Sequence, residues 1–329
     1  MTAGNFVWSW RDAGFGAVIA AVGIAVIVTG HVEMGLPMLM GSLPAAVIGL
    51  LPTRAQRRNL VILGLLFGTF LMLGSLIAQW ALIAVPGMFL LAFGGSMLAS
   101  KRRFGMIMLY LCVPLAGVGL SYEGLENSIN VGLLLIIGSI VAFGWSLCFK
   151  EYKPPIEPPA ATAKHSLFSN IQARNYGIKL GLTAAVSTAI GFLLGVDHMG
   201  WIVGASLFVM RPSQDVHKSR SIWRMISVFI GASTASLLLT LSLPPLMIGA
   251  LAGGALIASA ATHRSRRYIT PIFSTFLVFW LLLYTDPTYA NITYRFNERI
   301  LETLIGIGIA FVIGIAIPKL ISRLRSLSN

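Results

Sequence analysis

The chain has 329 residues, of which 56% are hydrophobic and only 11% are charged. Soluble globular domains carry about 25% charged residues, so the composition excludes a water-soluble protein of this length. The formal net charge of +13 would suit nucleic acid, but the basic residues stand in short segments between apolar runs. Membrane topology and anionic lipid headgroups explain that placement better. We therefore expect a lipid bilayer as a partner and no nucleic acid.

Twelve apolar runs predict an all-α integral membrane protein, because about 20 apolar residues span a bilayer as a helix. The eighth run has about half that length before Arg211 and Pro212, which predicts a tilted, broken or re-entrant helix covered by protein. The predicted spans are Ala13–Gly30, Gly35–Leu51, Asn59–Ala78, Trp80–Ala99, Phe104–Leu120, Ile129–Phe149, Tyr176–Gly195, Gly200–Met210, Ile222–Leu241, Leu246–Ala261, Tyr268–Tyr284 and Ile300–Pro318.

Basic and acidic residues alternate between the turns that join these spans. Arg54, Arg57 and Arg58 follow the second run, and the other even-numbered runs are also followed by basic residues. Acidic or neutral turns, such as those with Glu33 and Asp197, follow odd-numbered runs. Because basic loops face the cytoplasm, we expect a multi-pass protein with both termini in the cytoplasm.

A proline-rich stretch divides the chain into two halves of similar pattern. Lys-Pro-Pro and Glu-Pro-Pro follow the sixth run and predict a linker without a helix. Pro52 matches Pro212, Arg57 matches Arg220, and the cluster 102–104 matches 266–268. Six spans in each half predict two parallel six-helix repeats. The expected domains are a first repeat at 1–150, a cytoplasmic linker at 151–172 and a second repeat at 173–329.

Charged residues at the start of the last span are the first candidate site. Arg295 and Arg299 share one helix face, and Glu298 and Glu302 stand three residues after each of them. Ionised groups inside a membrane point to function by default. We predict that the arginines attract an organic anion and that Glu302 takes part in proton coupling or gating. A salt-bridge ladder at the outer helix end is the alternative.

A polar turn between the seventh and eighth spans is the second candidate. Asp197 and His198 precede Trp201 there, and His31 with Glu33 occupies the matching turn of the first half. Histidine titrates near neutral pH, so Asp197 and His198 could couple transport to protons, with Trp201 at the substrate. The alternative is a simple polar turn with Trp201 as an interfacial anchor.

Arginines after the short eighth run form the third candidate. Arg211 follows that run directly, Arg220 comes just before the ninth run, and Arg224 lies at its start. Positive-inside charge accounts for Arg220, but it accounts less well for Arg211 and Arg224, which border helices. An arginine fork binds carboxylates with two hydrogen bonds, so we predict that Arg211 and Arg224 contact an anionic substrate.

Enzyme signatures are absent from the sequence. It contains no His-Glu-x-x-His, Gly-x-Ser-x-Gly or phosphate-loop pattern. Cysteines and histidines do not cluster at metal-ligand spacing. We expect a protein that is not an enzyme, without catalytic residues, metal or cofactor, so that active transport would depend on ion gradients.

Spaced motifs in the second half carry a family resemblance. They are Gly195-Val-Asp-His-Met-Gly-Trp201, Leu207-Phe-Val-Met-Arg-Pro-Ser213, Arg220-Ser-Ile-Trp-Arg224 with Gly231, Arg266-Arg267-Tyr268 with Thr275, and Glu298-Arg299-Ile-Leu-Glu302-Thr-Leu-Ile-Gly306. Together they resemble the FUSC (fusaric acid resistance-like) family, which includes bacterial aromatic acid exporters and is similar to plant aluminium-activated malate channels. The resemblance covers about residues 174–314. It implies export of small organic anions across the bacterial inner membrane. Two departures are Ser227, where the family often has glycine, and Glu302, where it often has aspartate.

Three functions stay open at this point. The leading one is a secondary transporter that exports aromatic or other carboxylates, with proton coupling. An organic-anion channel and a membrane scaffold or lipid-handling protein are the alternatives. A major-facilitator fold is disfavoured because its Gly-x-x-x-Asp-Arg loop is absent at Leu51–Asn59, and a ten-span drug/metabolite transporter would need inverted halves. The expected partners are a small organic anion and the bilayer, and a homo-oligomer is left open.

Overall fold

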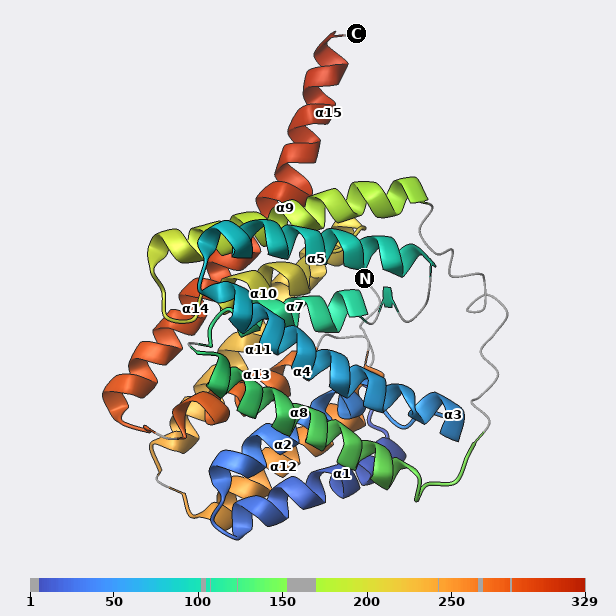
Figure 1. The fold of residues 1–329 in the computed structure, drawn as a ribbon, viewed down its shortest axis with the longest axis vertical. Coiled ribbons are helices and arrows are strands. Elements are labelled where there is room, and N and C mark those ends of the chain that lie inside the picture. The colour runs from blue at the N-terminus through green and yellow to red at the C-terminus, as the bar shows by residue number, and fades with distance from the viewer. Residues whose placement is uncertain are drawn as a thin grey trace. The chain divides into compact units, whose positions relative to one another are not determined.

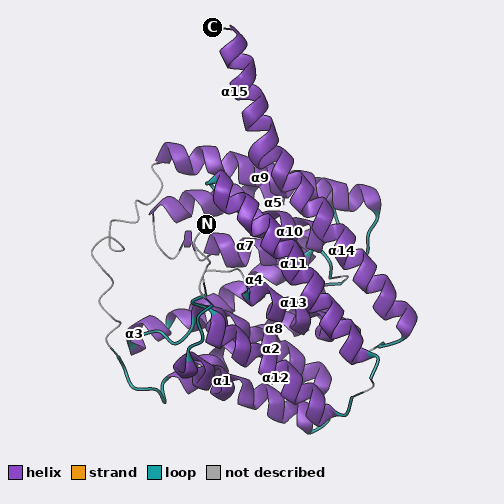
Figure 2. Ribbon diagram, turned by 180° about the vertical axis from the view of Figure 1, so that it is seen from behind, coloured by secondary structure: helices purple, strands orange, loops and turns teal. Residues whose placement is uncertain are grey.

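The computed structural model describes residues 6–101, 105–106, 108–122, 124–152, 170–241, 243–265, 269–284 and 286–328, and in these ranges every regular element is helical (Figures 1 and 2). The predicted basic clusters 102–104 and 266–268 and linker residues 153–169 lie outside these ranges. The elements are α1 (Trp10–Val28), α2 (Val32–Ile48), α3 (Arg54–Arg57), α4 (Asn59–Ala78), α5 (Ala81–Lys101), the π-helix η1 (Met108–Cys112), α7 (Val113–Gly119), α8 (Leu125–Ser146), α9 (Asn170–Leu194), α10 (Gly200–Val209), α11 (Gln214–Leu239), α12 (Pro245–Thr262), α13 (Thr270–Leu283), α14 (Tyr289–Phe311), the π-helix η2 (Val312–Ala316) and α15 (Ile317–Ser328).

The helices agree with the predicted membrane spans in number and order. Among the described residues, eight helices are long and apolar enough to cross a bilayer, and four shorter apolar helices lie between them in the sequence. The short ones are Val32–Ile48, Met108–Gly119, Gly200–Val209 and Thr270–Leu283. Helix α10 is therefore as short as predicted, and nine of its ten residues are buried, which satisfies the need to cover a short helix with protein.

Three predicted helix starts are wrong. Helix α9 begins at Asn170 instead of Tyr176, so the last residues of the expected linker are helical. Helix α11 begins at Gln214 instead of Ile222, and α14 begins at Tyr289 instead of Ile300. In each case the added turns are polar, and apolar content alone cannot detect a helix that extends through polar residues.

The chain folds into two compact units, and each unit draws on both halves of the sequence. Unit 1 comprises Met1–Gly68, Asn130–Ile156 and Trp223–Ile300. Unit 2 comprises Thr69–Ile129, Glu157–Ile222 and Leu301–Asn329. In unit 1, α1 packs along α12 and α2 (Figure 1), with Phe15, Ile19 and Leu256 in the core. In unit 2, α5 packs along α9, and α10 packs on α7 and α9.

Helices α2 and α8 of unit 1 meet through glycine and serine. A Cβ atom on Gly138 would collide with the backbone oxygen of Met38, and one on Gly41 would collide with the backbone of Leu135. The close approach lets Ser42 Oγ donate to the Gly138 oxygen at 3.1 Å and Ser139 Oγ donate to the Gly41 oxygen at 2.6 Å. Small residues of this kind let helices pack where lipid supplies no hydrophobic drive.

The turn between α2 and α3 is held by side chains from distant parts of unit 1. Asp12 Oδ1 accepts from the Leu50 nitrogen at 3.3 Å, and the Tyr152 hydroxyl donates to the Leu50 oxygen at 2.9 Å. Arg57 is fully buried. It donates to the Leu51 oxygen at 2.9 Å and to three backbone oxygens at the end of α8 and just beyond it, those of residues 146, 149 and 150. Arg57 thus has a structural role, because all three of its nitrogens donate to the backbone.

Candidate functional site

Arg211 lies in the turn between α10 and α11 in unit 2, where the sequence predicted an anion contact. Its side chain is buried, at 9% exposure. Nη1 donates to the backbone oxygen of Met210 at 2.5 Å and to that of Leu207 at 3.4 Å. The guanidinium carbon lies 4.1 Å from the centre of the Tyr110 ring, which is a cation–π contact. Both interactions fix the guanidinium at the end of α10.

Two tyrosines complete the wall beside Arg211. Tyr176 of α9 is buried, and its hydroxyl donates to the Met210 oxygen at 3.1 Å. The same hydroxyl interacts with Tyr110 and Arg211. The turn is therefore tied to α9 and to η1 by side chains that carry no charge of their own.

His217 lies in the first turns of α11, on the other side of the Arg211–Pro212 turn in sequence. Its backbone nitrogen donates to the Ser213 oxygen at 2.9 Å, and its side chain is 1% exposed. The ring atom Nε2 is buried and has no hydrogen-bond partner among the described residues. The ring packs on Gly314, where a Cβ atom would lie only 2.7 Å from Cε1. Glycine is thus required for η2 to approach the imidazole this closely.

The electrostatic state of this cluster is unusual for a buried arginine. None of the ion pairs among the described residues includes Arg211, and the described groups that contact it are backbone oxygens and tyrosines. Buried charges in proteins are normally paired. Both π-helices of the described chain contribute to the cluster, η1 through Tyr110 and η2 through Gly314. Such segments occur often at functional sites. The arrangement can bind an anion.

Three other predicted charges are also buried inside helices. Arg224 is 4% exposed in α11, and Arg299 and Glu302 are 3% and 1% exposed in α14. The sequence predicts Arg299 and Glu302 at the start of the last span. Because α14 begins at Tyr289, both residues lie in the middle of the helix instead. The predicted pair of Arg295 with Glu298 is confirmed, with Nη1 2.9 Å from Oε2.

The polar turn between α9 and α10 is exposed at one end and buried at the other. Asp197 is exposed, His198 is half-buried, and Trp201 is 8% exposed. Trp201 is therefore buried in the protein and is not an exposed interfacial anchor. Trp201 and Arg211 lie at opposite ends of α10, about 15 Å apart along a helix of this length. In the first half, His31 and Glu33 form an exposed pair at 3.5 Å.

Sequence reasoning missed Tyr110, Tyr176 and His217. Tyr110 stands inside an apolar run and Tyr176 at the start of one, where nothing distinguishes them from packing residues. His217 stands among basic residues of a predicted loop, and membrane topology already accounted for their charge. Its place six residues after Arg211, just inside a helix that begins earlier than predicted, was the available signal. Among the described residues, no group of three or more His, Cys, Asp or Glu could hold a metal ion.

The helices define an all-α, multi-span membrane protein by their length and composition. Residues 184–313 match the model of the fusaric acid resistance protein-like family, which confirms the resemblance read from the sequence. The match includes Arg211, His217, Arg299 and Glu302. Neither the curated proteins nor the solved structures gave a match to the chain.

Proposed function

We propose that the protein is a secondary transporter that exports small organic anions, aromatic or other carboxylates, across the bacterial inner membrane with proton coupling. The observation that carries the proposal is the burial of Arg211 without an ion-pair partner among the described residues. The match to the fusaric acid resistance protein-like family supports a transporter rather than an enzyme. Arg211 is the group that we expect to contact the anion.

The chemistry of the Arg211 cluster suits a carboxylate. A guanidinium binds a carboxylate through two parallel hydrogen bonds, which are stronger than those between neutral groups. Tyr110 lies against the guanidinium and Tyr176 lies beside it, so an aromatic acid would also find ring surfaces to pack on. The anion would neutralise a buried charge, which favours occupancy of the site over an empty state.

Other buried groups supply roles along the transport path. Arg224 and Arg299 are buried cations that we propose as further substrate contacts, together with Arg295 and Trp201. Glu302 is a buried carboxylate and is our candidate for proton coupling, with the turn of Asp197 and His198 as a second candidate. An acid inside a helix can exchange a proton when the ion-pair environment changes during transport.

The architecture that we propose for this transporter is a pair of parallel six-helix repeats with both termini in the cytoplasm. Helix packing supports an internal repeat, because α1 packs on α12 while α5 packs on α9, so the first helix of each half contacts the fourth helix of the other. Likewise α2 contacts α13, and α10 contacts α7. Pro52 and Pro212 each stand two residues before a helix, with Thr53 before α3 and Ser213 before α11 in between.

The test is efflux from liposomes that contain the purified protein. Benzoate and succinate are loaded as probes, with and without an imposed pH gradient, and wild type is compared with Arg211→Gln and Arg211→Lys. Loss of charge-assisted hydrogen bonds should lower flux about 10- to 100-fold in Arg211→Gln, with a smaller loss in Arg211→Lys. Arg58→Gln is the matched control, because Arg58 is exposed.

The outcomes separate the three functions. Flux that needs the pH gradient and falls in Arg211→Gln supports the proposal. Flux that follows voltage and ignores the pH gradient would indicate an anion channel. If neither probe crossed the membrane under any gradient, a scaffold or lipid-handling protein would replace the transporter.

A further inference from the structure

Helix α15 carries an apolar stripe that the other described helices of unit 2 leave uncovered. Ile317, Leu320, Ile321 and Leu324 occupy positions i, i+3, i+4 and i+7, so they share one helix face. Their side chains are 44%, 59%, 45% and 57% exposed. Helix α15 packs mainly on η2, which directly precedes it, and Figure 1 shows it extending away from α5 and α9 of the same unit. A continuous exposed apolar stripe of this kind marks a contact surface.

The remaining positions of α15 include basic residues and no acidic one. Lys319 and Arg323 are exposed, and neither forms an ion pair with any residue that the structure describes. Arg325 belongs to the same helix, and no Asp or Glu follows Glu302 in the sequence. The helix therefore combines an apolar stripe with an unbalanced positive charge, which is typical of helices that lie in a membrane interface.

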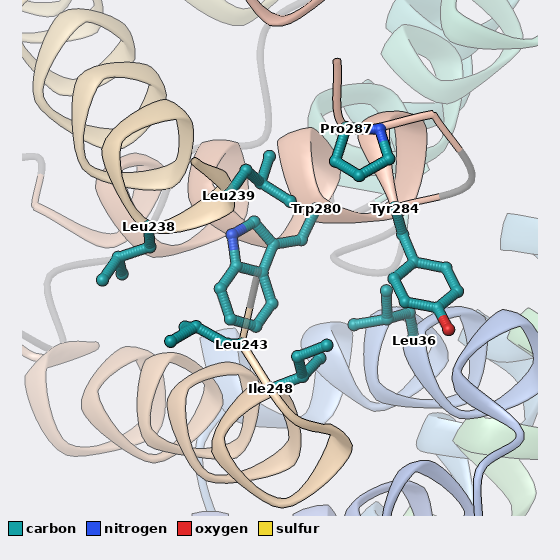
Figure 3. A pocket seen from close by; sticks show the side chains of 8 residues that line it. All are labelled: Leu36, Leu238, Leu239, Leu243, Ile248, Trp280, Tyr284 and Pro287. Atoms are coloured by element: carbon teal, nitrogen blue, oxygen red, sulfur yellow. The ribbon is translucent and has the colours of Figure 1, made fainter. Parts of the chain in front are cut away.

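An apolar pocket in unit 1 lacks this second feature. The pocket lies between the starts of α2 and α12 and the ends of α11 and α13 (Figure 3), and none of its eight lining residues is charged. Trp280 is only 2% exposed there, and its indole nitrogen is buried, so a ligand cannot reach that donor. The pocket thus has no group that selects a partner, whereas the charge of α15 selects an anionic one.

We propose that α15 is an interfacial helix that binds the anionic phosphate headgroups of the bilayer. Its apolar stripe would lie at the boundary of the acyl chains, with Lys319 and Arg323 at the phosphates. Basic residues near a membrane surface are attracted by anionic lipids, and the stripe supplies the apolar area that such a helix buries there. The proposal does not depend on anion transport through Arg211.

The position of α15 in the chain supports the bilayer as its partner. It continues the last candidate membrane span, and the combined helix Tyr289–Leu324 has 36 residues. A helix of that length measures about 54 Å, whereas the hydrocarbon core is about 30 Å thick, so part of it lies among headgroups. Pro318 and the π-helix η2 stand at the junction, where helices bend most readily, so α15 can turn onto the membrane surface.

A second copy of the chain suits the stripe less well than lipid does. Two α15 helices packed along their stripes would bring basic residues together, and neither helix has an acidic residue to pair with them. An anionic surface removes that repulsion, so the charge of the helix favours lipid over self-association.

A fluorescent label on the stripe tests the proposal in the full chain. The label NBD is attached to Leu324→Cys in protein whose exposed Cys148 is replaced by serine, while Cys112 is buried. The protein is placed at one copy per nanodisc in phosphatidylcholine, or in an equal mixture of phosphatidylcholine and phosphatidylglycerol. We expect blue-shifted emission in the anionic discs and emission closer to that in water in the neutral ones. The same label on Ser322→Cys, on the opposite face, should stay in water in both lipids.

Charge variants then separate headgroup binding from apolar insertion. Each basic residue near an anionic surface contributes about a fivefold factor, so removing all three should lower the ratio of bound to free helix about 100-fold. The variant combines Lys319→Gln, Arg323→Gln and Arg325→Gln. The matched control removes the same charge at exposed positions outside α15, through Arg58→Gln, Lys150→Gln and Lys218→Gln. Circular dichroism and gel filtration check that both variants fold.

Three results would overturn the proposal. Emission typical of water in both lipids would mean that the stripe does not reach the bilayer. An equal blue shift in both lipids that survives the loss of the three charges would mean insertion without headgroup binding. A shift that appears only in discs with two copies of the protein would mean that a second copy covers the stripe.

Discussion

Replacement of Gly138 by alanine tests whether the α2–α8 contact depends on backbone approach. The added Cβ would collide with the Met38 oxygen, so the helices must separate. Overpacking costs about 1–3 kcal/mol. The hydrogen bonds made by Ser42 and Ser139 across the contact would lengthen, at about 0.6 kcal/mol each in membrane helices. The sum is about 2–4 kcal/mol of lost stability.

The matched control is Gly144→Ala in the same helix, because a Cβ atom at Gly144 meets nothing within 4 Å. Both variants gain the same helix propensity from alanine, about 1 kcal/mol, so their difference isolates the packing effect. The measurement is the free energy of unfolding in mixed micelles titrated with SDS, followed by circular dichroism. Equal unfolding free energies for the two variants would refute the close-packed interface.

Two further predictions use pairs of matched variants. Arg57→Ala should destabilise the protein by about 3 kcal/mol or more, because four backbone oxygens lose a charged donor. Arg58→Ala, at an exposed position, should change stability by no more than about 0.5 kcal/mol. Unfolding in SDS compares the two variants, and similar unfolding free energies would contradict a structural role for Arg57. Gly314→Ala should slow benzoate efflux from liposomes about tenfold without unfolding, because its Cβ would press on the His217 ring, whereas Gly308→Ala meets open space and should leave efflux unchanged. Unimpaired efflux in Gly314→Ala would show that the contact with His217 has no part in transport.

Membrane spans were readable from the sequence because the signal is compositional. A run of apolar residues must be helical in a bilayer, so all twelve runs and the short α10 could be predicted. Helix starts at Gln214 and Tyr289 could not, since polar turns outside the apolar run obey helix propensity and tertiary contact instead. Which helices pack against each other could not be predicted either, because apolar helices in lipid have no polar face that indicates their orientation.

Among the side chains of the site, some could be predicted from the sequence and others could not. The burial of Arg211 was predictable, because an arginine directly after a short apolar run lies close to membrane depth. Tyr110 and Tyr176 were not, since a tyrosine in an apolar run gives no sign of what its hydroxyl contacts.

The anchoring of Arg57 sets an order of events during biogenesis. Three of its acceptors lie 89 to 93 residues further along the chain, at the end of α8 and just beyond it. At a synthesis rate of about 5–20 residues per second, those oxygens leave the ribosome about 5–20 s after the arginine does. Until then the guanidinium keeps its hydration and stays at the membrane surface, in water. The turn after α2 therefore closes last among the elements of the first half, and the nascent chain must wait for α8 before this corner of the protein is complete.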